Sequence, residues 1–308
     1  MLYKMVFIVY TIPVNILIAN VGNVRFNEVK ALSEALNKQH KVTLVTMAAE
    51  SSHRGVAFSF LDTPVRAAPL LYKDVINSTE WVAQGEGTLK NASKKKLEAF
   101  DGITAYEFAA NPADAISVML AEILQHEKPD LVICGINNGI HMGQDVYSSS
   151  SVGMAFEAAF FRVPTICVAV EHRVGGHSHA ELGNAVTFIE KNVEKFAKMH
   201  LPEHTFLNIN IPTVKAYKDF KGVRIARMGR LVQLSRYVEH VDSCGQKYYW
   251  ADYAERLNAN IGDEQFARTW YDRGYITVTP VSYDATDYDA VEGWNKGVIR
   301  ALKTEAAQ

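Results

Sequence analysis

Short apolar runs alternate with amphipathic segments along the first two thirds of the chain. The runs predict strands over 15–20, 41–47, 131–134, 165–170 and 206–212. Their length and their few polar positions are typical of strands buried on both faces of a parallel sheet. Apolar residues at helical spacing predict helices over 27–36, 113–126, 152–160 and 184–199. This alternation favours an α/β fold with a Rossmann-like, doubly wound, mostly parallel sheet.

The pattern changes after Pro212, where the strands become shorter and aromatic residues become denser. Tyr237, Tyr248, Tyr249, Trp250 and Tyr253 fall within one short stretch. Residues 274–280 alternate polar and apolar side chains, which predicts a strand buried on one face only. We expect an N-terminal extension over 1–14, an α/β core domain over 15–215, and a C-terminal extension of hairpins and a helix over 216–308.

Composition excludes several classes of protein. The 308 residues carry a formal net charge of -2, which argues against a dedicated nucleic-acid surface or an anionic-membrane surface. The apolar stretch 5–13 is too short to span a bilayer, and no small-x-small cleavage site follows it. Three scattered cysteines form no metal spacing, and Cys134 and Cys167 fall in apolar runs. We therefore expect buried thiols and a cytoplasmic protein.

The candidate chemistry lies in the loop after the predicted strand 131–134. This loop is rich in glycine, asparagine and serine, and it leads into the helix predicted from Val152. A small-residue loop between a strand and a helix start offers backbone N–H groups and hydroxyls at the positive end of the helix dipole. The loop predicts phosphate binding by Gly135, Gly139, Ser149, Ser150 and Ser151. The plainer alternative is that the serines only cap the helix.

The loop also resembles the second signature of the SurE nucleotidases, from Gly135-Ile136-Asn137 through Asp145-Val146 to the serines before Val152. The likeness continues at 111–114, 207–212 and 274–286, which resemble that family's TPAD, LNVNVP and GYVSVTPL..D.T segments. It implies a SurE-like fold and a 5'/3'-nucleotidase that hydrolyses nucleoside monophosphates with Mg²⁺ or Mn²⁺. By the same resemblance Asn137 binds the metal, the serines contact phosphate, and the C-terminal extension forms a homodimer or tetramer.

The chain departs from this family at the end of its first strand. Asn20-Val21-Gly22-Asn23 stands where the family has Asn-Asp-Asp-Gly, so Val21 and Gly22 replace both metal-binding carboxylates. A further ligand falls on Ser52 without gaps, whereas a small insertion places Arg54-Gly55 there, and both registers are open. The expected site comprises Asn20 and Asn137 as catalytic residues, Asn137 and Ser52 at the metal, and Asn23 with the loop residues at the phosphate.

Three functional hypotheses follow. The first is an active phosphomonoesterase with a rebuilt metal site. Asp145, His53 or the pair His177 and His179 are candidate replacement ligands, but the histidines are more simply explained as surface-loop residues, and the family has an Asp at position 145 that is not its lead ligand. The second is a catalytically inactive relative that binds a nucleotide or another phosphorylated small molecule. The third, a dinucleotide- or S-adenosylmethionine-binding enzyme, is disfavoured because residues 20–23 lack the glycine fingerprint GxGxxG.

Overall fold

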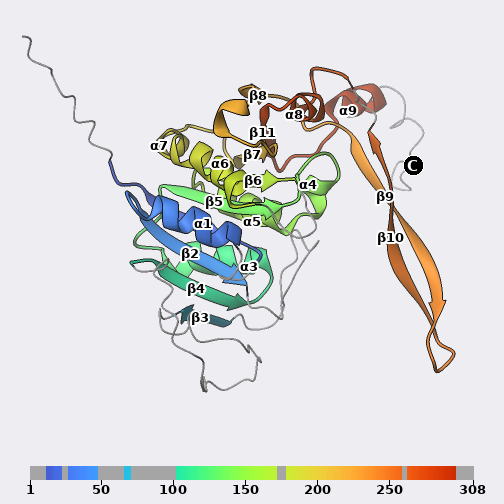
Figure 1. The fold of residues 1–308 in the computed structure, drawn as a ribbon, viewed down its shortest axis with the longest axis horizontal. Coiled ribbons are helices and arrows are strands. Elements are labelled where there is room, and N and C mark those ends of the chain that lie inside the picture. Colours follow the sequence, from blue (N-terminus) through green and yellow to red (C-terminus); the bar gives the residue numbers. More distant parts are fainter. Residues whose placement is uncertain are drawn as a thin grey trace, which may run out of the picture.

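The fold is built on one large twisted sheet (Figure 1). The computed structural model describes residues 12–22, 27–47, 66–70, 102–171, 178–258 and 262–295, with only the backbone at 66–70, 231–236, 251–258 and 295. Within these ranges the sheet has nine strands in the order β3-β4-β2-β1-β5-β6-β7-β11-β8. The strands are β3 (Arg66–Leu70), β4 (Thr104–Ala109), β2 (Lys41–Met47), β1 (Asn15–Ala19), β5 (Leu131–Asn138), β6 (Thr165–Val170), β7 (Thr205–Ile211), β11 (Ile276–Ser282) and β8 (Val223–Ile225).

The six inner strands from β4 to β7 all run parallel. Within the described part of this sheet, the antiparallel pairs are β3 with β4 and β7 with β11. β1, β2, β6 and β7 are buried almost throughout, as their continuous apolar runs predicted, whereas β4 is exposed at both ends and was not among the predicted strands. The predicted α/β fold with a mostly parallel sheet is confirmed.

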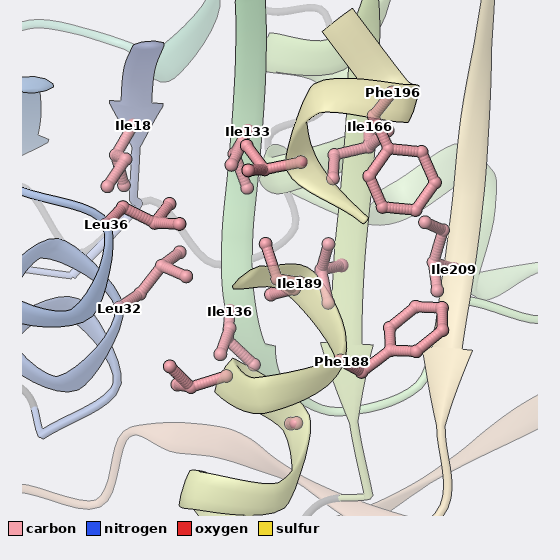
Figure 2. Packing of buried hydrophobic residues seen from close by; sticks show 14 of the residues in the cluster. Ile18, Leu32, Leu36, Ile133, Ile136, Ile166, Phe188, Ile189, Phe196 and Ile209 are labelled. Carbon is pink, nitrogen blue, oxygen red and sulfur yellow. The ribbon is translucent and has the colours of Figure 1, made fainter. Parts of the chain in front are cut away.

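Helices cover both faces of the sheet and complete two hydrophobic cores. One core joins the sheet to α1 (Asn27–Leu36), α6 (His179–Glu190) and α7 (Val193–Ala197). Figure 2 shows this core, where Leu32 and Leu36 of α1 and Phe188 and Ile189 of α6 lie over the isoleucines of the strands. The other core joins the opposite face to α3 (Pro112–Val118), its π-helical continuation η2 (Met119–Ile123) and α5 (Ser150–Phe160).

The predicted end of one strand and the predicted extent of one helix were wrong. Strand β5 does not end at Cys134 but continues to Asn138, because a bulge lets Asn137 and Asn138 keep pairing with β6. The helix predicted over 184–199 begins earlier, since Ser178 and Glu181 form a capping box that starts α6 at His179. That helix also breaks between α6 and α7, where the Asn192 side chain donates to the Phe188 carbonyl (2.8 Å).

The C-terminal part divides between the main sheet and a projecting arm. After the turn η3 (Tyr217–Asp219), β8 and β11 extend the main sheet. The long strands β9 (Leu231–Val241) and β10 (Lys247–Asn258) form a separate antiparallel hairpin that leaves the body as an arm (Figure 1). Helix α8 (Ala267–Asp272) packs against β11 and β8, and α9 (Tyr288–Asn295) follows β11 in the chain. The division at residue 215 stays a prediction.

Strand β11 differs from the expectation that one of its faces is exposed. Thr277 and Thr279 are as buried as Ile276 and Val278 on the other face. β8 pairs with β11 at the edge of the sheet, and the Thr279 hydroxyl donates to the Ala226 carbonyl in the segment after β8 (2.8 Å). The Thr277 hydroxyl is also buried but has no hydrogen-bond partner among the described residues, so only one of these two threonines is satisfied inside the protein. Across the described ranges, no helix is both long and apolar enough to span a bilayer.

Candidate phosphate-binding site

The candidate site lies at the edge of the sheet where β1 and β5 end. These two strands are parallel neighbours, so the residues that follow them meet at the same edge. Asn20, directly after β1, is 6% exposed and donates through Nδ2 to the Ile136 carbonyl of β5 (3.4 Å). Its Oδ1 accepts from the Gly22 N–H (2.8 Å). Asn20 therefore joins the two strand ends and fixes the turn that follows β1.

Gly135 allows β5 to bulge at this edge. Its φ is +133°, a value that L side chains rarely adopt, and a Cβ atom built there would lie 2.3 Å from the Val168 carbonyl oxygen on β6. Gly139, at the end of the bulged segment, has a φ of +147°. Gly135 therefore lets the backbones of β5 and β6 approach each other closely, and this close approach sets the position of Asn137.

The loop residues predicted to hold phosphate come together around Asn137 and the start of α5. Asn137 Nδ2 donates to the Gly139 carbonyl (2.7 Å), and the Ser151 hydroxyl donates to Asn137 Oδ1 (3.3 Å). Ser149 is the N-cap of α5, where its Oγ accepts from the Val152 N–H (3.4 Å). Ser150 and Ser151 are buried in the first turn of the helix, whereas Ser149 is half-buried. We call Gly139, Asn137 and Ser149–Ser151 the anion cradle.

Several predicted residues fall outside the described ranges, namely Asn23, Ser52, His53, Arg54, Gly55 and His177. Their roles stay predictions. His179 is described and begins α6 as an exposed residue. Asp145 is the first residue of the short helix α4 (Asp145–Ser148), and its carbonyl accepts from the Ser149 N–H (3.0 Å).

The resemblance implies a divalent cation beside β1, and the described residues do not fit one. Val21 and Gly22 carry no oxygen donor in their side chains. The amides of Asn20 and Asn137 are neutral and already hydrogen-bonded within the protein. Among the described residues no three His, Cys, Asp or Glu side chains are grouped as a metal site requires. Because Mg²⁺ and Mn²⁺ prefer carboxylate oxygens, this donor set is a poor match for either ion.

His141 is a residue of the site that the sequence did not single out. It lies in the loop between β5 and α4, is 2% exposed, and places Nε2 2.9 Å from the Ser149 hydroxyl oxygen. Burial lowers the pKa of His141 from 6.5 to about 4, so the imidazole is neutral at physiological pH. The sequence places this histidine in a glycine-rich loop, which was the one available indication of a role. Most of the residues that it contacts are distant in the chain, so the sequence did not reveal them.

An open cavity of about 590 Å³ lies between α4, β8 and β11, and its lining includes the Asp284 carboxylate. Tyr147, two residues before Ser149, forms one wall and is 60% exposed. Arg227 and Gln265 supply polar groups on the lining, and Met228 and Ile225 supply apolar ones. An aromatic ring, a guanidinium and mixed walls are the groups that bind a nucleobase and a ribose.

Comparison with known proteins places the chain in a family. Residues 16–234 match the family model described as survival protein SurE. A 5'-nucleotidase SurE from Caldanaerobacter subterraneus subsp. tengcongensis is 31% identical over 198 residues, which cover 64% of this chain and 74% of that protein. The 5'-nucleotidase SurE of Acinetobacter baylyi is 30% identical over 287 residues, covering 90% of this chain and 97% of that protein.

The fold agrees with these sequence matches. The crystal structure of the SurE protein from Aquifex aeolicus superimposes with a TM-score of 0.65 at 23% identity, covering 91% of this chain and 98% of that one. The matched residues include β1 from Ile16 onward, the whole of β5 and the anion cradle. The chain belongs to the SurE family of 5'-nucleotidases.

Proposed function

We propose that this chain binds a nucleoside monophosphate through the anion cradle and lacks the metal-dependent hydrolysis of its family. The single observation that carries the proposal is the donor set at the end of β1. There Val21 and Gly22 provide no carboxylate, while Asn137 and Ser151 still gather at the start of α5. The residues expected to bind the anion are therefore present, whereas the carboxylates expected to bind the metal are missing.

Three features support phosphate binding at the cradle. The first-turn N–H groups of an α-helix carry positive partial charge and point out of its N-terminus. Helix α5 has 11 residues, so its dipole is that of a full-length helix. The Ser151 hydroxyl and one Asn137 N–H are used within the cradle, which leaves the Ser149 hydroxyl and the second Asn137 N–H as side-chain donors close to that end. A phosphate dianion placed there meets donors and no described carboxylate of the cradle.

The cavity beside Tyr147 supports a nucleoside as the rest of the ligand. Its volume of about 590 Å³ lies within the range of small-molecule sites, roughly 300–1,000 Å³. Tyr147 is two residues before Ser149 in the chain and lines the cavity, so we infer that a ligand with its phosphate at Ser149 extends toward this ring. Inorganic phosphate alone would leave this cavity unused.

The end of β1 lacks the negative charge that would hold a catalytic cation. The nucleotidases of this family are metal-dependent in general. A divalent cation neutralises phosphoryl charge and activates water, and carboxylates in its first shell hold it there. Replacing two directly paired anions with Val21 and Gly22 removes several kcal/mol of attraction. Neutral amides do not restore it, so we expect neither tight Mg²⁺ binding nor efficient turnover.

A hydrolysis assay tests the proposal. Turnover of AMP and p-nitrophenyl phosphate is measured with Mg²⁺, Mn²⁺ or Co²⁺, for the natural chain and for Val21→Asp/Gly22→Asp. The matched control is Val21→Asn/Gly22→Asn, which adds side chains of the same size without charge. We expect AMP binding without turnover in the natural chain, and tighter Mn²⁺ binding only in the aspartate variant.

Hydrolysis by the natural chain would contradict the proposal. Metal-dependent turnover by the natural chain, abolished by Asn137→Ala, would establish the active phosphomonoesterase instead. Ser52 and its neighbours would then be the first residues to test as ligands. Absence of AMP binding would refute the proposed site.

We also infer that the chain forms a homodimer or tetramer through the β9–β10 hairpin. Two-stranded ribbons are marginally stable alone in water. This one exposes Tyr237 (63%) on one face and Trp250 (65%) on the other. A second copy that packs on the arm would bury both faces.

For location we infer the cytoplasm, since Cys134 and Cys167 lie opposite each other on adjacent strands as free thiols.

A further inference from the structure

The backbone of His141 is held by three hydrogen bonds to one strand. Its N–H donates to Asn210 Oδ1 (2.7 Å). Its carbonyl accepts from Asn208 Nδ2 (2.7 Å) and from Asn210 Nδ2 (3.1 Å). Both asparagines project from β7 and are 1% exposed. This clamp fixes the loop over the sheet and leaves the imidazole little freedom to move.

The imidazole lies between a thiol and a hydroxyl. Nδ1 is 3.5 Å from Cys167 Sγ, and Nε2 is 2.9 Å from Ser149 Oγ. Burial raises the pKa of Cys167, so this residue stays a thiol and its S–H is able to donate to Nδ1. A neutral imidazole that accepts at Nδ1 carries its proton on Nε2. In this tautomer, which the Cys167 S–H donor favours, His141 donates to Ser149.

This arrangement determines where the Ser149 hydroxyl hydrogen points. The Ser149 oxygen accepts from His141 Nε2–H and from the Val152 N–H (3.4 Å). Its own O–H therefore has to point away from both donors. Because Ser149 is half-buried whereas His141 is 2% exposed, the exposed side of Ser149 is where this O–H can meet a ligand at the start of α5.

We propose that His141 is a positioning residue, a neutral donor that turns the Ser149 hydroxyl outward so that it donates to a phosphate oxygen. The inference rests on the proposed function, because it names the device that orients one donor of that site. It differs from a serine–histidine nucleophile pair. A general base would have to become a cation in a site that is 2% exposed, and among the described residues neither ring nitrogen is hydrogen-bonded to a carboxylate.

The test is a double-mutant cycle on inorganic phosphate affinity, measured by calorimetry. A hydrogen bond to a charged group contributes about 1.5–3 kcal/mol, so Ser149→Ala should weaken binding roughly 10- to 100-fold. We expect His141→Phe to weaken it by about 3- to 10-fold, and the double variant to bind no worse than Ser149→Ala alone. Ser148→Ala, at the exposed neighbouring hydroxyl, is the matched control and should leave affinity unchanged.

A second readout does not depend on phosphate. In protein labelled with ¹⁵N-histidine, the His141 signals, assigned by their loss in His141→Gln, should show protonated Nε2 and bare Nδ1 at pH 7. His141→Gln keeps an N–H donor and should retain more phosphate affinity than His141→Phe. Protonated Nδ1, additive losses in the cycle, or full affinity in a folded His141→Phe protein would overturn the inference. If the natural chain binds no phosphate, the proposed function fails, and the tautomer still decides the state of His141.

Discussion

The burial of His141 predicts a specific loss of stability in mild acid. Its pKa falls from 6.5 to about 4 in the folded protein, because burial disfavours the imidazolium. Between these values the unfolded chain binds a proton that the folded chain does not, so stability decreases as the pH falls. Above pH 6.5 the imidazole is neutral in both the folded and the unfolded state, so it causes no pH-dependent loss of stability. Below pH 4 both are protonated and this loss reaches its limit.

The magnitude follows from the shift. A difference of about 2.5 pKa units corresponds to roughly 3 kcal/mol at the acid limit, and about 2 kcal/mol of it is lost between pH 7 and pH 5. Urea unfolding of the natural chain and of His141→Gln at both pH values gives four free energies of unfolding. The natural chain should lose about 2 kcal/mol more than the variant over this interval.

The comparison of the two proteins isolates one group among ten histidines. His126→Gln, at an exposed position after η2, serves as the matched control variant. If the natural chain and His141→Gln lose the same stability between pH 7 and pH 5, the imidazole is not held neutral. The reasoning on its tautomer would then fail as well.

Three further perturbations test other parts of the structure. Gly135→Ala should destabilise the fold by about 3 kcal/mol in urea unfolding, because its Cβ would lie 2.3 Å from a carbonyl oxygen. Gly183→Ala, within α6 and with nothing nearby, should instead stabilise it by roughly 0.5–1 kcal/mol. In calorimetry, Tyr147→Ala and Arg227→Ala should each weaken AMP binding several-fold and leave inorganic phosphate binding unchanged, and equal losses for both ligands would contradict the nucleoside site. Trp250→Ser should lower the mass measured by light scattering, and an unchanged mass would remove this side chain from the interface.

The sheet was predictable because its strands are specified locally. Runs such as Leu131–Cys134 and Thr165–Val170 are apolar on both faces, and only burial between two helical layers accommodates that pattern. The same reasoning ended β5 too early, since Gly135 and Asn137 are typical of loops. They remain in the strand because β6 supplies partners for them, and that pairing is not visible in the local sequence.

The residues of the anion cradle were partly predictable from the sequence, but His141 and the residues that hold it in place were not. A glycine-rich loop before a helix start indicates Asn137 and the serines at Ser149–Ser151 without knowledge of the fold. His141 gains its role from Cys167, 26 residues away, and from Asn208 and Asn210, 67 and 69 residues away. Tertiary folding alone brings these groups together, so no pattern of spacing points to them.

Titration of the natural chain with AMP, in EDTA and then in excess Mn²⁺, tests most directly whether the anion cradle works without a cation. The absence of carboxylates at Val21 and Gly22 predicts the same affinity in both buffers and intact AMP recovered at the end. Binding that appears only with Mn²⁺, accompanied by release of adenosine and phosphate, would contradict this prediction.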